Sequence, residues 1–138
     1  MVKIMIVTHG PLAEALKESA RMFFAEKVDN ITSIGLYPSD NIDDLKGKVK
    51  NAITEIYSDD GILAFVDIFA GSPFNMVALT MGEVKEQYPK IQCFTGANLV
   101  MIMEALAQAD STSLDDLTKH LEEQAPNSII NVNKMLGL

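Results

Sequence analysis

The chain has 138 residues, 48% of them hydrophobic, and a formal net charge of -8 from 11 basic and 19 acidic side chains. This length predicts a single domain over residues 1–138 with a substantial apolar core. The acidic excess argues against a nucleic-acid-binding protein and against a polybasic membrane anchor, because both need clustered positive charge.

Short apolar runs alternate with segments of helical periodicity along the chain. Residues 2–7 predict a buried strand, and Pro11 is well placed at the start of a helical stripe that reaches Phe24. The run over residues 62–66 is apolar on both faces, which is typical of a central strand in a parallel sheet. The remaining elements continue the alternation, with strands over residues 31–36 and 91–94 and helices over residues 42–56, 73–88, 99–107 and 114–121.

Four strand–helix units in sequence predict an α/β fold, namely a doubly wound, mainly parallel sheet with helices on both faces. We expect the strand order 2-1-3-4, in which the first and third strands are neighbours. Residues 128–132 (Ser-Ile-Ile-Asn-Val) are predicted as a fifth strand that does not fit this rhythm. Two placements are open for it: an antiparallel strand on the same sheet, or a strand that leaves its own subunit.

Cysteine usage and apolar run lengths indicate where such a chain would act. Cys93 is the only cysteine, which excludes an internal disulfide and suits a reducing, cytoplasmic compartment. The first apolar run is short and carries Lys3, unlike a signal peptide, and no apolar stretch is long enough to span a bilayer. We therefore expect a soluble cytoplasmic domain.

His9 is the first candidate for chemistry. It ends the first predicted strand, just before Gly10-Pro11, and Asp67 ends the third predicted strand in the same way. In open α/β sheets, ligands bind at the carboxyl edge of the strands, at the point where the winding direction reverses. If the first and third strands are neighbours, the imidazole and the carboxylate face each other across that point.

A carboxylate beside an imidazole fixes the ring's tautomer and leaves the other nitrogen with a nucleophilic lone pair. Two predicted helix starts, Gly10-Pro11 and Ser72-Pro73, flank the pair, and helix N-termini favour anions. Gly71 and Ser72 add a permissive loop and a hydroxyl group. Together these residues describe a phosphohistidine site; taken singly, each is equally well explained as a strand-end cap or a helix start.

Other chemistry has little support. Two dispersed histidines and one cysteine give no metal-ligand spacing, and no glycine-rich nucleotide-binding fingerprint follows any strand, so we expect no metal and no cofactor. We interpret His120 as a solvated side chain on an amphipathic helix and Cys93 as a small core residue.

Three stretches carry a family resemblance: Thr8-His9-Gly10, residues 66–75 (Val-Asp-Ile-Phe-Ala-Gly-Ser-Pro-Phe-Asn), and Gly96-Ala97-Asn98-Leu99 with Met101. With them, over nearly its whole length, the chain resembles the IIA component of the mannose family of the bacterial sugar phosphotransferase system (PTS). Two departures stand out. Ala70 replaces a glycine that is common in the family, and its methyl group restricts φ; Phe69 stands where a bulkier aromatic residue is common.

The resemblance implies a phosphocarrier, a phosphotransferase component without a cofactor. It would accept a phosphoryl group from the general carrier protein HPr on Nε2 of His9 and pass it to a histidine of the IIB component, which phosphorylates the sugar that a membrane permease (IIC/IID) moves. Asp67 is implied to orient and charge the ring through Nδ1, and Ser72, with Gly71 and Gly10, to lie at the phosphoryl group. The resemblance also implies a homodimer in which residues 128–132 pair with the partner's sheet.

Three alternatives remain at this stage. A related family with this fold and a histidine after the first strand serves dihydroxyacetone kinase. A hydrolase triad of Ser72, His9 and Asp67 is disfavoured, because the Gly-x-Ser-x-Gly elbow is absent and Ser72 precedes Pro73. A non-catalytic binding module of flavodoxin-like shape would retain a ligand and would not be phosphorylated.

Overall fold

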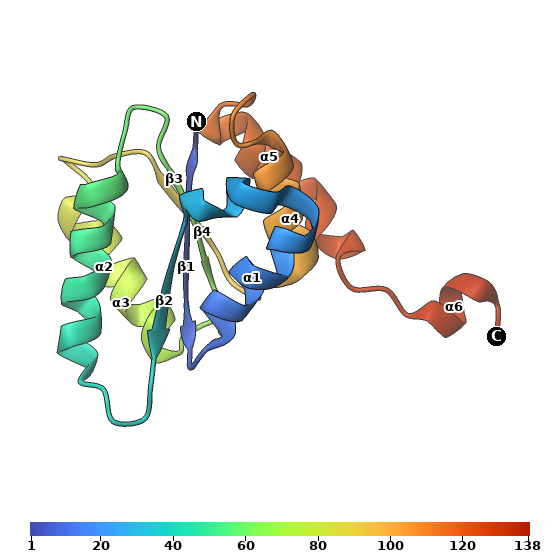
Figure 1. Ribbon diagram of the computed structural model, residues 1–138, viewed down its shortest axis with the longest axis horizontal. Coiled ribbons are helices and arrows are strands. Elements are labelled where there is room, and N and C mark those ends of the chain that lie inside the picture. Colours follow the sequence, from blue (N-terminus) through green and yellow to red (C-terminus); the bar gives the residue numbers. More distant parts are fainter.

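Four parallel strands form the centre of the computed structural model, which describes residues 1–138 (Figure 1). The strands are β1 (Lys3–His9), β2 (Ile31–Leu36), β3 (Ile62–Val66) and β4 (Ile91–Phe94). They pair in the order β2-β1-β3-β4, so the predicted order and the adjacency of the first and third strands are confirmed.

Helices cover both faces of the sheet, as predicted. Helices α2 (Ile42–Ile56) and α3 (Ser72–Val84) lie on one side, while α1 (Leu12–Phe24), α4 (Leu99–Gln108) and α5 (Leu114–Gln124) lie on the other (Figure 1). Two short 3-10 helices, η1 (Ala25–Asn30) and η2 (Ala125–Asn127), follow α1 and α5. Helix α3 ends at Val84, four residues earlier than the periodicity predicts, and Tyr88 follows a turn.

The alternation of strand side chains divides the core into two layers. Ile4 and Ile6 of β1 pack with α1, α4 and α5, while Met5 and Val7 of the same strand pack with α2 and α3. Every residue of β3 is buried, as expected for a strand with helices on both sides. This burial fixes the register of β1 against β3 and thus the position of the residues at their carboxyl ends.

The C-terminal segment differs from the prediction. Residues 128–132 form no strand in this chain; residues 128–131 are irregular and a short helix, α6 (Val132–Leu136), follows. Asn131 caps α6 by accepting from the Lys134 N–H at 3.2 Å. A strand needs a neighbouring edge to supply its hydrogen bonds, and this segment projects away from the sheet (Figure 1). The predicted exchange of a strand between subunits stays a prediction.

No helix of the structure combines the length and the apolar composition needed to cross a membrane.

Candidate functional site

His9 and Asp67 meet at the carboxyl edge of the sheet. His9 is the last residue of β1 and Asp67 directly follows β3. Nδ1 of His9 lies 2.9 Å from Oδ2 of Asp67, and the same oxygen accepts from the His9 main-chain N–H at 3.0 Å. Oδ1 of Asp67 accepts from the Ile68 N–H at 3.0 Å. The sequence-based prediction that these two residues face each other is therefore confirmed.

The two side chains of the pair differ in their exposure and in which atom carries a proton. The Asp67 side chain is only 10% exposed, whereas the His9 side chain is 45% exposed. Burial raises the pKa of Asp67, but the hydrogen bonds from the main chain and ring of His9 outweigh it, so that the pKa lies below its ordinary value. An ionised carboxylate only accepts hydrogen bonds, so Nδ1 carries the proton. Nε2 then has the free lone pair, and it makes no hydrogen bond with the protein.

The loop that follows Asp67 closes against the imidazole. A side chain at position 71 would place its Cβ 3.0 Å from Cε1 of His9, a contact so tight that the ring or the loop would have to shift by a few tenths of an ångström. Cε1 is bonded to Nε2, which places Gly71 beside the reactive edge of the ring. Ala70 adopts a left-handed conformation with φ of 65°, and its carbonyl accepts from Nδ2 of Asn75 at 3.4 Å. Ala70 therefore adopts a strained backbone conformation that a glycine would adopt without that cost.

Free N–H donors lie on the α3 side of the ring. Ser72 and Phe74, in the first turn of α3, have N–H groups without a hydrogen-bond acceptor in the protein, and Gly71 precedes the helix as its cap. On the α1 side, the Gly10 N–H donates to the Leu36 carbonyl at 2.7 Å and the Ala13 N–H to Oγ1 of Thr8 at 2.8 Å. The Gly71 N–H donates to the Ile68 carbonyl at 3.2 Å, whereas the Leu12 and Glu14 N–H groups of α1 also have no acceptor in the protein, so both helix starts offer donors. The predicted phosphoryl contacts of Ser72, Gly71 and Gly10 stay predictions.

Two residues at this edge were not identified from the sequence. Thr8 is fully buried, and its hydroxyl caps the first turn of α1, because Pro11 at the N-cap position has no side chain that can do so. Gly35 of β2 lies so close to the turn after β1 that a Cβ would stand 2.3 Å from the Gly10 carbonyl oxygen. A threonine in an otherwise apolar strand and a glycine inside a strand are the signals that could have identified them.

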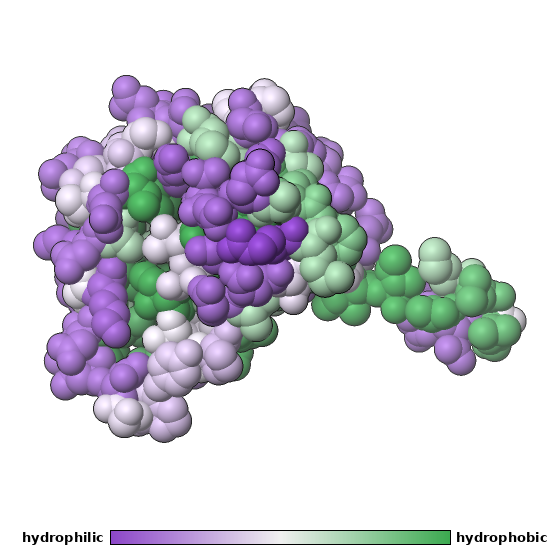
Figure 2. Space-filling view, in the orientation of Figure 1, coloured by the Kyte–Doolittle hydropathy of each residue, from purple (hydrophilic) through white to green (hydrophobic).

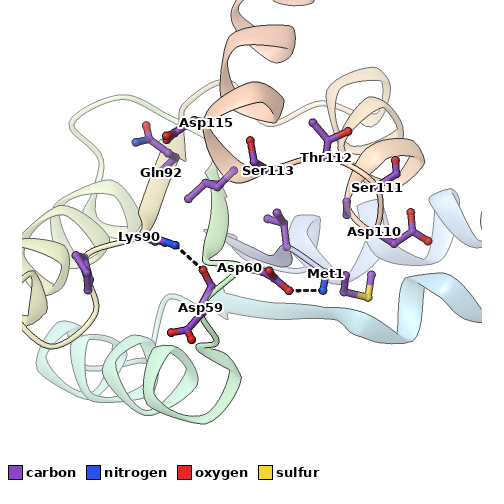
Figure 3. A pocket seen from close by; sticks show the side chains of 14 residues that line it. Met1, Asp59, Asp60, Lys90, Gln92, Asp110, Ser111, Thr112, Ser113 and Asp115 are labelled. Atoms are coloured by element: carbon purple, nitrogen blue, oxygen red, sulfur yellow. Dashed lines mark hydrogen bonds and ion pairs between the residues drawn. The ribbon is translucent and has the colours of Figure 1, made fainter.

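The surface hollow beside the pair is small. It measures about 380 Å³ and is lined by His9, Gly10, Leu36, Tyr37, Pro38, Asp40 and Ile42. A larger hollow of about 450 Å³ lies at the opposite edge of the sheet (Figure 3). There the Met1 ammonium group binds Oδ2 of Asp60 at 2.7 Å, and Nζ of Lys90 donates to the Asp59 carbonyl at 2.9 Å. The volume of a hollow therefore does not identify the candidate reactive site, since the larger hollow contains neither His9 nor Asp67.

The remaining candidates have structural partners. Nε2 of His120 lies 2.8 Å from Oε2 of Glu104, so this histidine joins α5 to α4 instead of being solvated. Burial raises the pKa of the Cys93 thiol to about 11, which leaves it unreactive and agrees with its assignment to the core. No group of three His, Cys, Asp or Glu side chains is placed to hold a metal ion.

Comparisons with known proteins agree with this geometry. The family described as "PTS system fructose IIA component" matches residues 3–122. The PTS system fructose-specific EIIA component of Bacillus subtilis is 30% identical over 128 residues, which are 93% of this chain and 84% of that protein. The PTS system mannose-specific EIIAB component of Escherichia coli is 34% identical over 117 residues, which are 84% of this chain but 35% of that protein.

A solved structure of a phosphotransferase system component EIIA from Streptococcus agalactiae superposes with a TM-score of 0.83 and 24% identity, covering 97% of this chain and 99% of that one. At this identity the likeness establishes the fold, while the family match and the curated relatives establish the lineage. The chain belongs to the mannose family of IIA components of the sugar phosphotransferase system, and it is a phosphoryl-transfer component of sugar transport.

Proposed function

We propose that His9 is the phosphoryl carrier of this IIA component. The observation that carries the proposal is the 2.9 Å contact between Nδ1 of His9 and Oδ2 of Asp67, which leaves Nε2 as the free nucleophile on an exposed ring. Nε2 attacks the phosphorus of a phosphohistidine on HPr; the new N–P bond forms as the bond to the donor's imidazole breaks. The reverse exchange passes the group to a histidine of IIB.

Asp67 stabilises the positive charge that the ring gains on phosphorylation. Because its pKa lies below the ordinary value, the carboxylate is ionised throughout the neutral range. Oδ2 binds both the ring and the main chain of His9, so the carboxylate needs no rearrangement when the charge appears. The positioning residue and the electrostatic partner are therefore the same group.

The first turn of α3 would hold the phosphoryl oxygens. The free N–H groups of Ser72 and Phe74 and the Ser72 hydroxyl lie beside the loop that packs on Cε1 of His9. Unpaired N–H groups and the helix dipole both favour a doubly negative group. We assign the phosphoryl contact to Ser72 and to the Phe74 N–H. Gly71 and Gly10, whose N–H groups already donate to the Ile68 and Leu36 carbonyls at 3.2 and 2.7 Å, shape the turns on either side of the ring.

The proposed partners approach over an apolar rim. Exposed apolar side chains follow three strands at this edge, in the loops and at the helix starts: Leu12 after β1, Tyr37 and Ile42 after β2, and Ile68 and Phe69 after β3. Such a patch around a reactive side chain is typical of a protein docking surface. HPr and IIB would dock here in turn, and the IIC/IID permease would be reached only through IIB. We therefore propose that the carrier acts in the cytoplasm as a single domain over residues 1–138.

We also propose a homodimer formed through the C-terminal segment. Residues 129–138 are exposed and rich in apolar side chains, including Ile129, Met135 and Leu138 (Figure 2). Apolar surface of this kind gains stability when a second copy covers it. The exchanged strand predicted over residues 128–132 would form only in that assembly, where the partner's sheet supplies an edge.

Phosphorylation by HPr tests the proposal directly. The chain is incubated with phosphoenolpyruvate, enzyme I and HPr, and the labelled residue is found by mass spectrometry under alkaline conditions, where phosphohistidine is stable. We expect one phosphoryl group on His9, none in His9→Gln, and full labelling in the matched variant His120→Gln. Label that persists in His9→Gln would contradict the proposal. Asp67→Asn should fold and accept phosphate about a hundredfold more slowly.

A further inference from the structure

The turn between β4 and α4 is bonded to the main chain of the Asp67 loop. The Gly96 N–H donates to the Asp67 carbonyl at 3.1 Å, and the Ala97 N–H donates to the Val66 carbonyl at 3.0 Å. The direction of the Asp67 carboxylate depends on the main chain that carries it. The turn at residues 95–98 therefore bears on the His9–Asp67 pair without touching His9.

Asn98 closes that turn with both ends of its amide group. Its Oδ1 accepts from the Met101 N–H at 3.1 Å, which caps α4. Its Nδ2 donates to the Gly96 carbonyl at 3.1 Å and to Oγ of Ser128 at 3.4 Å. Gly96 has φ of 69°, a left-handed conformation that the Nδ2 bond holds in place.

We propose that Asn98 is a positioning residue for phosphoryl transfer. Its Nδ2 holds the Gly96 carbonyl, the turn presents the Gly96 and Ala97 N–H groups to the β3 end, and these bonds keep Asp67 directed at Nδ1 of His9. Asn98 thus acts through Asp67 on the tautomer of the ring. The kinetic part of this inference rests on the proposed role of His9, whereas the tautomer part does not.

The two functions of the Asn98 amide can be separated by substitution. Asn98→Ser retains an acceptor for the Met101 N–H, because serine caps helices about as well as asparagine, but it removes both Nδ2 donors. Ser128→Ala removes the weaker of the two Nδ2 partners and leaves the bond to Gly96. Asn98→Asp, which also retains the cap, is the second variant if Asn98→Ser does not fold.

Two readouts are measured on the full chain. Imidazole ¹⁵N NMR gives the fraction of His9 with the proton on Nδ1. Phosphorylation by phospho-HPr, quenched at a series of times, gives the transfer rate. In Asn98→Ser we expect a smaller Nδ1-protonated fraction and a transfer rate lower by about tenfold, the scale of a modest misplacement of a reacting group. Ser128→Ala should differ from the wild type by less than about twofold in rate, with an unchanged tautomer, because the Gly96 bond remains.

Three results would overturn the proposal. The first is a wild-type rate and tautomer in Asn98→Ser. The second is a slower rate with an unchanged tautomer, which assigns Asn98 a structural role only. The third is an equal effect of Ser128→Ala, which assigns the effect to the C-terminal segment instead of Gly96. Failure of wild-type His9 to accept phosphate would remove the proposed function, yet the NMR comparison would still decide the positioning role.

Discussion

At the scale of single residues, one carboxylate oxygen holds both the ring and the backbone of the same histidine. Oδ2 of Asp67 accepts from Nδ1 and from the main-chain N–H of His9. This arrangement fixes the ring relative to its own backbone, so the side chain loses rotamer freedom before any partner arrives. Preorganisation of this kind suits a histidine that must meet two different partner proteins in the same orientation.

The Asp67 interactions make stability depend on pH in the acid range. A carboxyl group whose pKa is lower in the folded than in the unfolded chain adds stability above its unfolded pKa of about 3.9, and this stability is lost as the pH falls through the folded value. We expect urea unfolding to show wild type more stable than Asp67→Asn near pH 6, with the difference shrinking below about pH 4. A difference that is constant from pH 6 to pH 2.5 would contradict an ionised Asp67.

Ala70 stores strain in the loop that packs on His9. A non-glycine residue with φ of 65° costs about 1 kcal/mol or more relative to glycine in that conformation. Ala70→Gly should therefore raise the free energy of unfolding by about 0.5 kcal/mol, the remainder being offset by the greater freedom of glycine in the unfolded chain. Urea denaturation measures this change in the free energy of unfolding. Ala78→Gly, at an exposed position of α3, is the control and should destabilise the fold. Destabilisation by Ala70→Gly would mean that the left-handed conformation is not strained.

At the scale of elements, the turn after β1 depends on a cap that comes from the strand itself. The buried Thr8 hydroxyl accepts from the Ala13 N–H across the Gly10-Pro11 turn. Thr8→Val preserves shape but leaves that N–H unpaired, which should cost about 1–3 kcal/mol in urea unfolding. Amide exchange at Ala13 should accelerate in Thr8→Val and stay slow in Thr8→Ser; equal protection in both variants would show that the hydroxyl does not cap α1.

The loop after β3 supplies the most exposed aromatic ring of the rim. The Phe69 side chain is 72% exposed and packs against Phe74 with ring centroids 4.9 Å apart. If HPr docks on this rim, Phe69→Ala should lower kcat/KM for transfer from phospho-HPr by about tenfold or more, the effect of losing an aromatic anchor. Met22→Ala, at the far end of α1, is the matched exposed control and should leave the rate unchanged. Equal rates in all three proteins would exclude Phe69 from the interface.

At the scale of the whole molecule, the compact α/β body and the projecting C-terminal segment have opposite surface character. The body buries most of its apolar side chains in two layers and exposes others only in places such as the rim around His9, whereas the apolar side chains of residues 129–138 are exposed (Figure 2). Deleting residues 129–138 should convert a dimer into a folded monomer, measured by sedimentation velocity and circular dichroism. A full-length chain that sediments as a monomer at micromolar concentration would contradict the proposed assembly.

The arrangement of elements also explains why the site lies far from the hollow at the amino edge of the sheet. The hollow in Figure 3 is at the amino edge of the sheet, where the Met1 ammonium group and Lys90 are engaged by the turn at Asp59 and Asp60. At the carboxyl edge, by contrast, the first turn of α3 and the ends of the strands lie together on a shallow surface. A shallow site is compatible with the proposed transfer of a phosphoryl group between proteins, in which a partner's histidine would approach His9.

The amino-acid sequence by itself determined the alternation of strands and helices and identified the candidate pair His9 and Asp67, whereas the strand order was an expectation from the commonest doubly wound arrangement that the structure confirmed. These follow from local patterns: apolar periodicity, turn residues and the rule that ligands gather at the carboxyl edge. The family motifs then narrowed the chemistry to phosphoryl transfer. The apolar periodicity predicts the elements because each helix and strand buries one or both faces against its neighbours, so nearly every core position is apolar.

Only the tertiary structure decided which polar groups are free and which are already bonded. The Gly10, Ala13 and Gly71 N–H groups are already bonded, to Leu36, Thr8 and Ile68, whereas N–H groups in the first turns of α1 and α3 have no acceptor in the protein. His120 bonds to Glu104 on another helix, and the segment predicted as a strand projects away from the sheet of its own chain instead of pairing with β2 or β4 at its edges. Hydrogen bonds between residues distant in sequence depend on distances of tenths of an ångström, which local sequence patterns do not encode.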